Sequence, residues 1–183
     1  MKRIVILIAA AFLAAATAMA GNDPGTPELK SRKRLDPTLR LVLPVNAGVS
    51  TLLNSDAPAT PLYRNFMFNI EPVGVRWSAR GTPFELNVAS RFNFLNFGNG
   101  HAFYAGVPVR ASLRFAKRGR VYATAAGEYL IHGTMHNMPW RCALETGISY
   151  CGVGVFASYG VTPFFTTATG PGNTLSFGLV VGL

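Results

Sequence analysis

The feature that most constrains the fold of this chain is a strict alternation of apolar and polar side chains, seen best in residues 84–94. One face carries Phe84, Leu86, Val88, Phe92 and Phe94, and the other carries Glu85, Asn87, Arg91 and Asn93. Because successive side chains of an extended strand point to opposite sides, this segment is predicted to be a strand with one apolar and one polar face.

The same alternation recurs in eight segments. They are residues 39–49, 66–77, 84–94, 103–115, 121–131, 144–150, 153–165 and 175–183. In the second segment the apolar positions shift by one residue near Glu71 and Pro72, which predicts a β-bulge there. The links between segments are alternately short and long. The short ones are near 80–81, 117–120 and 151–152, and the long ones cover 50–65, 95–102, 132–140 and 166–173.

The N-terminus predicts export from the cytoplasm. Two basic residues precede an apolar run over residues 4–13, and Ala18 and Ala20 form a small-residue cleavage site, so residues 1–20 are predicted to be a cleavable signal peptide. An uncleaved anchor is the alternative, but the apolar run is short for a membrane-spanning helix. After cleavage, fifteen basic and eight acidic residues would remain, a net charge of +7.

Residues 21–37 form a polar, proline-broken segment that precedes the barrel predicted for residues 38–183. The segment contains a basic cluster, Lys30, Arg32, Lys33 and Arg34, for which we expect contact with lipid headgroups. It is either a short helix capped by Thr26 or a solvated disordered arm. In an exported protein the basic surplus favours lipid phosphates and lipopolysaccharide as partners and disfavours nucleic acid.

Alternation alone does not say which strand face points inward, since a soluble carrier barrel also has a period of two. Composition decides the question. The mature chain would keep only three lysines, Lys30, Lys33 and Lys117, and its polar strand faces consist mostly of small uncharged residues. Such a face would be a poorly solvated exterior in water. We therefore predict an all-β, eight-stranded antiparallel up-and-down transmembrane β-barrel in the outer membrane, with a soluble periplasmic carrier as the third alternative.

The few charges on the strands nearly balance, and the predicted interior network comprises Glu71, Arg76, Glu85, Arg91, Arg110, Arg114, Glu128 and Glu145. Unpaired charge is costly in a narrow barrel, so we expect these side chains to pair. A paired network fills the interior of an eight-stranded barrel, which disfavours an open general pore.

In architecture, residues 38–183 resemble the small eight-stranded outer-membrane barrels of the OmpA transmembrane-domain and OmpX type. The local match is the closing segment, residues 174–183, TLSFGLVVGL. The resemblance implies a location in the Gram-negative envelope and recognition of the C-terminal strand by the outer-membrane assembly machinery. We expect a structural, surface-contact or lipid-interacting role without cofactor or metal.

The alternative is an enzyme that modifies lipid A, because some barrels of this size are hydrolases or acyltransferases that use a histidine. The histidines are His101, His132 and His136, all in or beside predicted extracellular loops. His132 and Thr134 would share a strand face, with Glu128 or Glu145 available to orient the imidazole.

The spacing of Cys142 and Cys151 bears on whether the sixth alternating segment is a single strand or a hairpin. If residues 142–151 form one strand, the two cysteines lie roughly 30 Å apart, too far for a disulfide. If the chain instead reverses at Thr146 and Gly147, they face each other across a hairpin. Closure of an eight-stranded barrel favours the single strand.

Overall fold

The computed structural model describes the part of the chain that forms the barrel. The described ranges are residues 35–40, 44–53, 64–79, 82–98, 100–115, 118–134, 137–166 and 172–183. The predicted signal peptide and the basic cluster Lys30, Arg32, Lys33 and Arg34 lie outside these ranges. Within them, no helix is long and apolar enough to cross a membrane.

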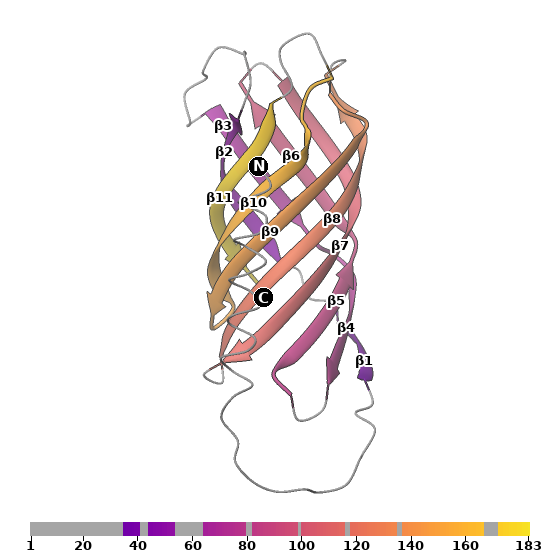
Figure 1. Ribbon diagram of the computed structural model, residues 1–183, viewed down its shortest axis with the longest axis vertical. Helices are drawn as coiled ribbons and strands as arrows, with labels where there is room; N and C mark the ends of the chain where they lie inside the picture. The colour runs from indigo at the N-terminus through magenta and orange to yellow at the C-terminus, as the bar shows by residue number, and fades with distance from the viewer. Residues whose placement is uncertain are drawn as a thin grey trace, which may run out of the picture. The chain divides into compact units, whose positions relative to one another are not determined.

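Eleven strand segments make up the eight walls of a closed antiparallel barrel (Figure 1). The first three walls are each built from two segments: β1 (Leu35–Arg40) with β2 (Val45–Leu53), β3 (Asn65–Ile70) with β4 (Gly74–Ala79), and β5 (Phe84–Ala89) with β6 (Arg91–Phe97). The other five are β7 (Gly100–Phe115), β8 (Gly119–Gly133), β9 (Trp140–Tyr150), β10 (Val153–Pro163) and β11 (Asn173–Val181). The predicted fold class and strand count are confirmed.

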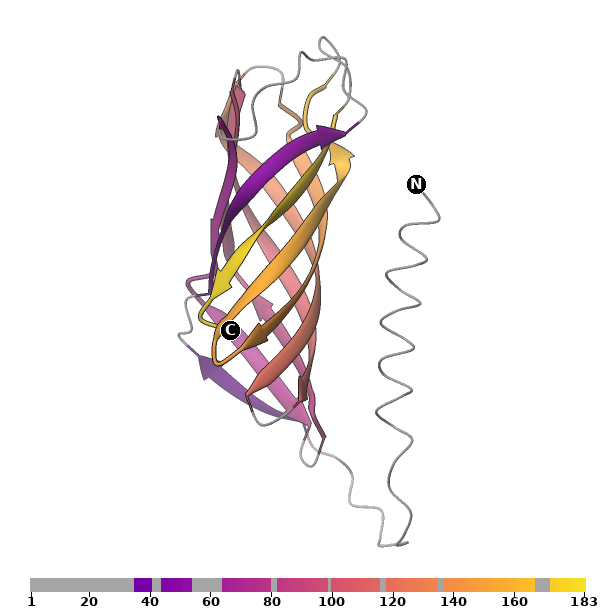
Figure 2. The same cartoon turned by 90° about the vertical axis from the view of Figure 1, so that its left-hand side faces the viewer.

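The ring closes where the first and last walls meet. β2 pairs with β11 from Val45 opposite Val181 to Leu53 opposite Asn173, and Figure 2 shows the two strands side by side. β1 pairs with β4, so it continues the first wall below β2, and it begins at Leu35 within the segment expected to be a tail. We call the end joined by links 54–64, 98–99, 134–139 and 164–172 the loop end, and the opposite end the turn end.

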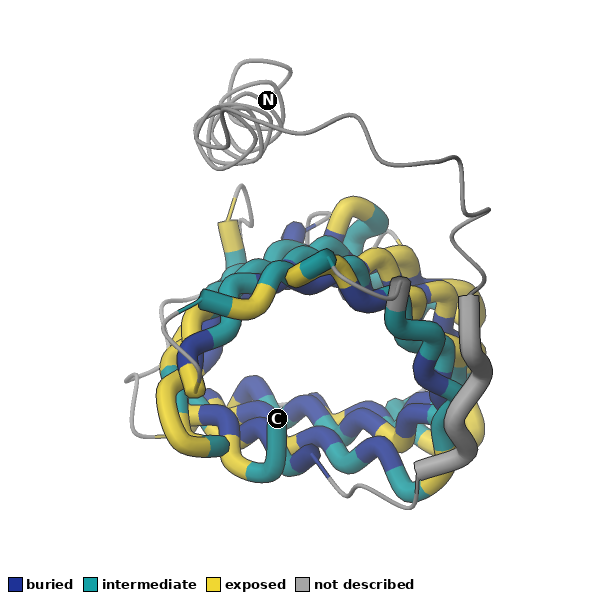
Figure 3. The backbone as a smooth tube through the Cα atoms, turned by 90° about the horizontal axis from the view of Figure 1, so that it is seen from below, coloured by how far each residue is buried: buried dark blue, intermediate teal, exposed yellow. Residues whose placement is uncertain are grey.

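The barrel is apolar outside and polar inside. Buried and exposed positions alternate along the strands in Figure 3. Among the described residues, buried polar or charged side chains outnumber buried apolar ones. The exposed positions include Val107, Val155, Phe177 and Leu179, each about half exposed. This is the polarity of a barrel surrounded by lipid, and it is the opposite of a soluble carrier with an apolar cavity.

The predicted bulge lies between β3 and β4. Phe66 and Phe68 are exposed in β3, whereas Glu71 is buried and Val73 is exposed beyond the break, so the outward phase changes as expected. The Glu71 amide donates a hydrogen bond to the Pro44 carbonyl at 3.1 Å. Regular alternation already places Glu71 on the inward face with Asn69, and the bulge reverses the phase after it, so that Val73 faces outward and Arg76 faces inward.

The third wall is interrupted at Ser90, which the sequence analysis did not predict. Val88 pairs with Val109 and Arg91 with Gly106 in one continuous register, which places Ala89 opposite Pro108. Proline has no N–H to donate to the neighbouring strand, so the ladder is broken at this point. The Ser90 amide instead donates to the Val73 carbonyl at 2.8 Å.

The prediction of a long loop over residues 95–102 was wrong. β6 continues to Phe97 and β7 starts at Gly100, so only two residues link them, and Gly98 adopts a positive φ of 55°. The expectation failed because the inward positions there are apolar as well. Leu95, Phe97 and Ala102 belong to a buried apolar cluster, and the contrast between the two strand faces disappears.

Residues 142–150 lie in the single strand β9, as predicted from barrel closure, and Cys151 lies in the turn that follows. Both cysteines are exposed and free. Cys151 has a φ of 55°, a left-handed conformation at a tight strand connection.

Candidate functional site

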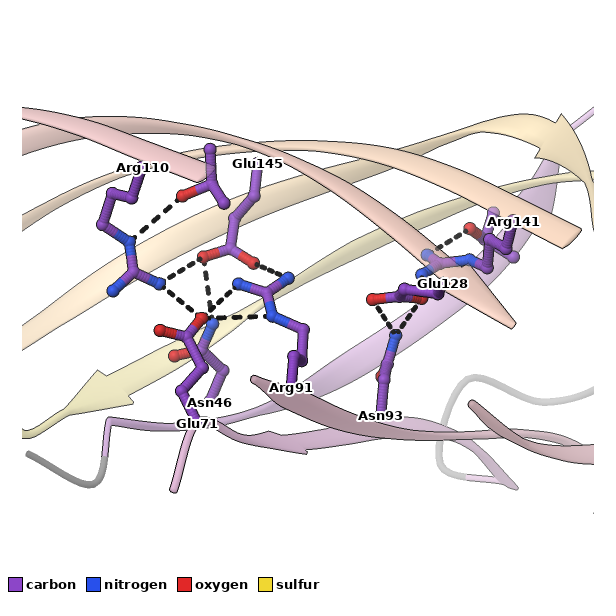
Figure 4. A network of polar contacts seen from close by, with 10 residues as sticks. Asn46, Glu71, Arg91, Asn93, Arg110, Glu128, Arg141 and Glu145 are labelled. Carbon is purple, nitrogen blue, oxygen red and sulfur yellow. Dashed lines mark hydrogen bonds and ion pairs between the residues drawn. The ribbon is translucent and has the colours of Figure 1, made fainter. Parts of the chain in front are cut away.

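The candidate site is a set of charged side chains that crosses the interior of the barrel (Figure 4). At its centre two carboxylates face two guanidinium groups, brought together from four different walls. Glu71 comes from the bulge between β3 and β4, Arg91 from β6, Arg110 from β7 and Glu145 from β9. All four are at most 3% exposed. The group is electrically neutral, as burial requires.

Arg91 bridges the two carboxylates. Its Nη2 lies 2.5 Å and its Nε 3.1 Å from Glu71 Oε1, and its Nη1 lies 3.1 Å from Glu145 Oε2. Arg110 Nη2 donates to the same Glu71 oxygen at 2.7 Å. The planar guanidinium of Arg91 offers several donors in a fixed geometry, so this one side chain can donate hydrogen bonds to carboxylates from two walls at once.

Neutral polar groups complete this central cluster. Asn46 of β2 donates to Glu145 Oε1 at 3.0 Å, and Arg110 Nε donates to Thr124 Oγ1 of β8 at 3.1 Å. The Arg110 guanidinium also lies over the Tyr122 ring, 4.9 Å from its centroid. The cluster thus fastens six walls to one another through side chains, in addition to the backbone ladder.

A second cluster lies on the side of the loop end. Arg141 of β9 forms an ion pair with Glu128 of β8 and donates from Nη2 to Thr174 Oγ1 of β11 at 3.2 Å. Asn93 Nδ2 contacts both Glu128 oxygens, at 3.0 and 3.2 Å. Glu128 and Arg141 are almost fully buried and carry opposite charges, so this cluster is neutral as well.

A third cluster surrounds Glu85 near the turn end. Arg120 Nη2 lies 3.0 Å, Arg114 Nε 3.2 Å and Arg76 Nη1 3.8 Å from its carboxylate oxygens. The Arg114 side chain is 49% exposed, which makes it the outermost member. Solvent screens this pair far more than the central ones.

Apolar side chains fill the interior of the barrel on the loop-end side of the charged clusters. Met67, Leu95, Phe97, Tyr104 and Phe164 are buried in one cluster, with the Phe97 and Phe164 rings in an edge-to-face contact at 4.7 Å. The central cluster borders a cavity of about 20 Å³, lined by Pro44, Glu71, Gly74, Arg76, Asn87, Ala89 and Arg110. A cavity of this size holds about one water molecule.

All eight residues expected in the interior network lie in these three clusters. Two further arginines, Arg120 and Arg141, and the amides that join the clusters were not predicted from the sequence. Arg141 was detectable, because it lies four residues before Glu145 and therefore shares its strand face. Arg120 follows a tight turn, where alternation gives no phase.

The structure does not bring the predicted catalytic residues together. His132 is exposed, whereas Glu128 and Glu145 are buried and paired with arginines. Thr134 donates its hydroxyl hydrogen to Asn137 Oδ1 at 2.7 Å. The imidazole of His132 lies beside that of His101, with centroids 5.7 Å apart. His136 lies outside the described residues.

Within the described ranges, no group of three or more His, Cys, Asp or Glu side chains could hold a metal ion. The inward carboxylates are instead committed to guanidinium groups. The arrangement is therefore suited to fastening the walls together rather than to acid–base chemistry.

No protein-family model matches the chain, and no curated protein matches it. Among solved structures, the chain is similar to a de novo designed transmembrane β-barrel at 15% identity and a TM-score of 0.36, over 78% of this chain and 96% of that one. It is also similar to the outer membrane protein Ail of Yersinia pestis, solved in a phospholipid bilayer nanodisc, at 11% identity and a TM-score of 0.38, over 78% and 99% of the two chains.

The fold and site described above define the class of this protein by themselves. It is a small eight-stranded antiparallel barrel with the apolar exterior of a transmembrane barrel and an interior packed with paired charges.

Proposed function

We propose that this chain is an integral outer-membrane β-barrel of the Gram-negative envelope, with a structural, surface-contact or lipid-interacting role and no open general pore. It would be exported by the signal peptide of residues 1–20. The observation that carries the proposal is the pairing of Arg91 with both Glu71 and Glu145 across the interior. A barrel that passes solutes needs a water-filled lumen, and this one is filled by side chains from opposite walls.

The energetics of the central cluster support a closed lumen. Glu71 and Glu145 each contact both Arg91 and Arg110, so opening a passage would separate several buried ion pairs at once. Removing one partner of a single buried pair costs roughly 3–5 kcal/mol. Thermal fluctuations would rarely supply that energy, so a permanently conducting state is disfavoured.

The outer surface supports contact with lipid. Aromatic side chains are exposed at both ends of the strands, with Tyr129 and Trp140 in an edge-to-face pair toward the loop end and Tyr150 at the turn end. Such rings favour the headgroup level of a bilayer. Lys30, Arg32, Lys33 and Arg34 would then contact lipid phosphates on the periplasmic side, and the closing strand would engage the assembly machinery.

Cell fractionation combined with gel mobility tests the proposal. The protein should be found in the outer membrane, require detergent for extraction, and migrate differently with and without boiling. Purified protein in planar bilayers should show no steady conductance. The matched variants are Arg91→Ser, which should weaken the lumen packing, and Val107→Ser on the outer wall, which should not.

Other outcomes would contradict the proposal. A protein that is soluble in the periplasm would overturn the membrane location, and a stable open conductance of the unsubstituted protein would overturn the closed lumen. Loss or gain of lipid A acyl chains that depends on His132 would establish the enzymatic alternative instead.

A further inference from the structure

One irregularity of the barrel wall changes the direction of a single histidine. Between β7 and β8, Tyr104 pairs with Leu130, but the next pair toward the loop end is Phe103 with His132. β8 therefore accommodates Ile131 as an extra residue, which is a β-bulge. Without it, His132 would continue the inward face of Glu128 and Leu130.

The bulge places His132 on the exposed outer wall, beside His101 of the neighbouring strand. His101 alternates in β7 with the buried Ala102 and Tyr104, so it also faces outward. The imidazole centroids lie 5.7 Å apart, with the ring planes inclined by 34°. The Thr134 amide donates to the His101 carbonyl at 3.2 Å, which ties the two strand ends together beside the pair.

From this geometry we propose that His101 and His132 form a binding site for a divalent transition-metal ion on the outer wall at the loop end. Imidazole nitrogen binds such ions at about 2.0–2.1 Å, which sets the centroids of two rings on one ion roughly 5–6.5 Å apart. The observed separation falls in this interval. Water completes the coordination, because both side chains are exposed.

The ligand type selects the metal class. Neutral imidazole suits copper, nickel and zinc, whereas magnesium and calcium require oxygen ligands. Among the divalent ions, copper binds nitrogen sites most tightly. The site lies three residues beyond Tyr129 of the Tyr129–Trp140 pair, toward the loop end, so the ion reaches it from the aqueous side. The metal site requires only that the barrel is folded.

Cu²⁺ titration of the purified, untagged protein tests the proposal, followed by calorimetry and by electron paramagnetic resonance. All samples carry Cys142→Ser and Cys151→Ser, because these exposed thiols would bind or reduce copper. The variants are His101→Ala and His132→Ala, and His136→Ala is the matched control. Heat-modifiable migration is recorded for each one, so that a loss of binding is separated from a loss of fold.

We expect one Cu²⁺ per chain with two nitrogen ligands. His101→Ala and His132→Ala should each weaken binding by about tenfold or more, since loss of even an indirect supporting group typically costs 10–100-fold. His136→Ala should leave the affinity unchanged. Equal affinity of the parent protein and either folded His101→Ala or His132→Ala would overturn the proposal, as would an equal loss on His136→Ala.

Discussion

Replacing Arg91 by methionine tests whether the charged interior stabilises the barrel through pairing. The substitution keeps much of the side-chain length and removes three donors, those directed at Glu71 and Glu145. Glu71 retains Arg110 at 2.7 Å, but the one cation left near Glu145 among the described residues is Arg110, at 3.8 Å. Arg91→Met therefore leaves one buried carboxylate without a close cation.

The expected loss in the free energy of unfolding is roughly 3–5 kcal/mol, the usual cost of breaking a buried ion pair from one side. Arg91→Met combined with Glu145→Gln removes one charge of each sign and keeps the Glu71–Arg110 pair. The double variant should recover most of the loss, because an uncompensated buried charge is the main penalty. Arg114→Gln is the control, since its half-exposed pair with Glu85 should contribute about 0–1 kcal/mol.

Urea unfolding of the protein in phospholipid vesicles, followed by the fluorescence of its two tryptophans, measures these differences. A loss for Arg91→Met no larger than that for Arg114→Gln would refute the reasoning. A double variant as unstable as Arg91→Met alone would show that lost packing, and not unpaired charge, causes the effect.

Three further predictions concern the walls. Val107 lies at the middle of β7 on the exposed face, and Val107→Arg should lower the free energy of unfolding in vesicles by about 2–4 kcal/mol, as a charge at the bilayer midplane does. A negligible loss in the same unfolding assay would contradict a lipid-facing wall. Gly147→Ala should destabilise the barrel by about 1–3 kcal/mol because its Cβ would lie 2.6 Å from the Tyr122 ring. Gly127→Ala is the control and should be tolerated, since its Cβ would meet nothing within 4 Å. Thermal unfolding in detergent would measure both effects. Cys142 and Cys151 should both react with a maleimide without prior reduction, and a mass spectrum with no adduct on the folded protein would contradict two free thiols.

The alternation of side chains was sufficient to predict the walls but not all of their connections. Phe103, Val107 and Val109 in β7 differ in polarity from Arg110 and Ser112, so period and phase are both visible there. Near Leu95 and Phe97 the inward face is apolar too, and the same criterion predicted a loop where the strand continues. Alternation predicts a strand only where its two faces differ in polarity, and this difference is lost where apolar side chains fill the barrel interior.

The candidate site was likewise only partly predictable from the sequence. Glu145 and Arg110 were assigned to the interior from their strand phase alone, but which charges meet depends on the stagger of the walls. Arg91 reaches Glu145 although 54 residues separate them, and it does so because β6 and β9 lie on facing sides of a narrow ring. Sequence alternation fixes which side of a wall a residue occupies and carries no information about its height along the barrel.

Irregular positions, rather than regular ones, distinguish this barrel from a generic one. Regular alternation beyond Glu71 would turn Arg76 outward, and beyond Leu130 it would turn His132 inward behind Glu128. Two bulges reverse these directions: the first turns Arg76 inward toward Glu85, and the second places His132 beside His101 on the outer wall. Bulges of this kind re-aim a side chain while the ladder on either side continues. The two residues that they redirect, Arg76 and His132, therefore belong to the charged cluster around Glu85 and to the proposed metal site.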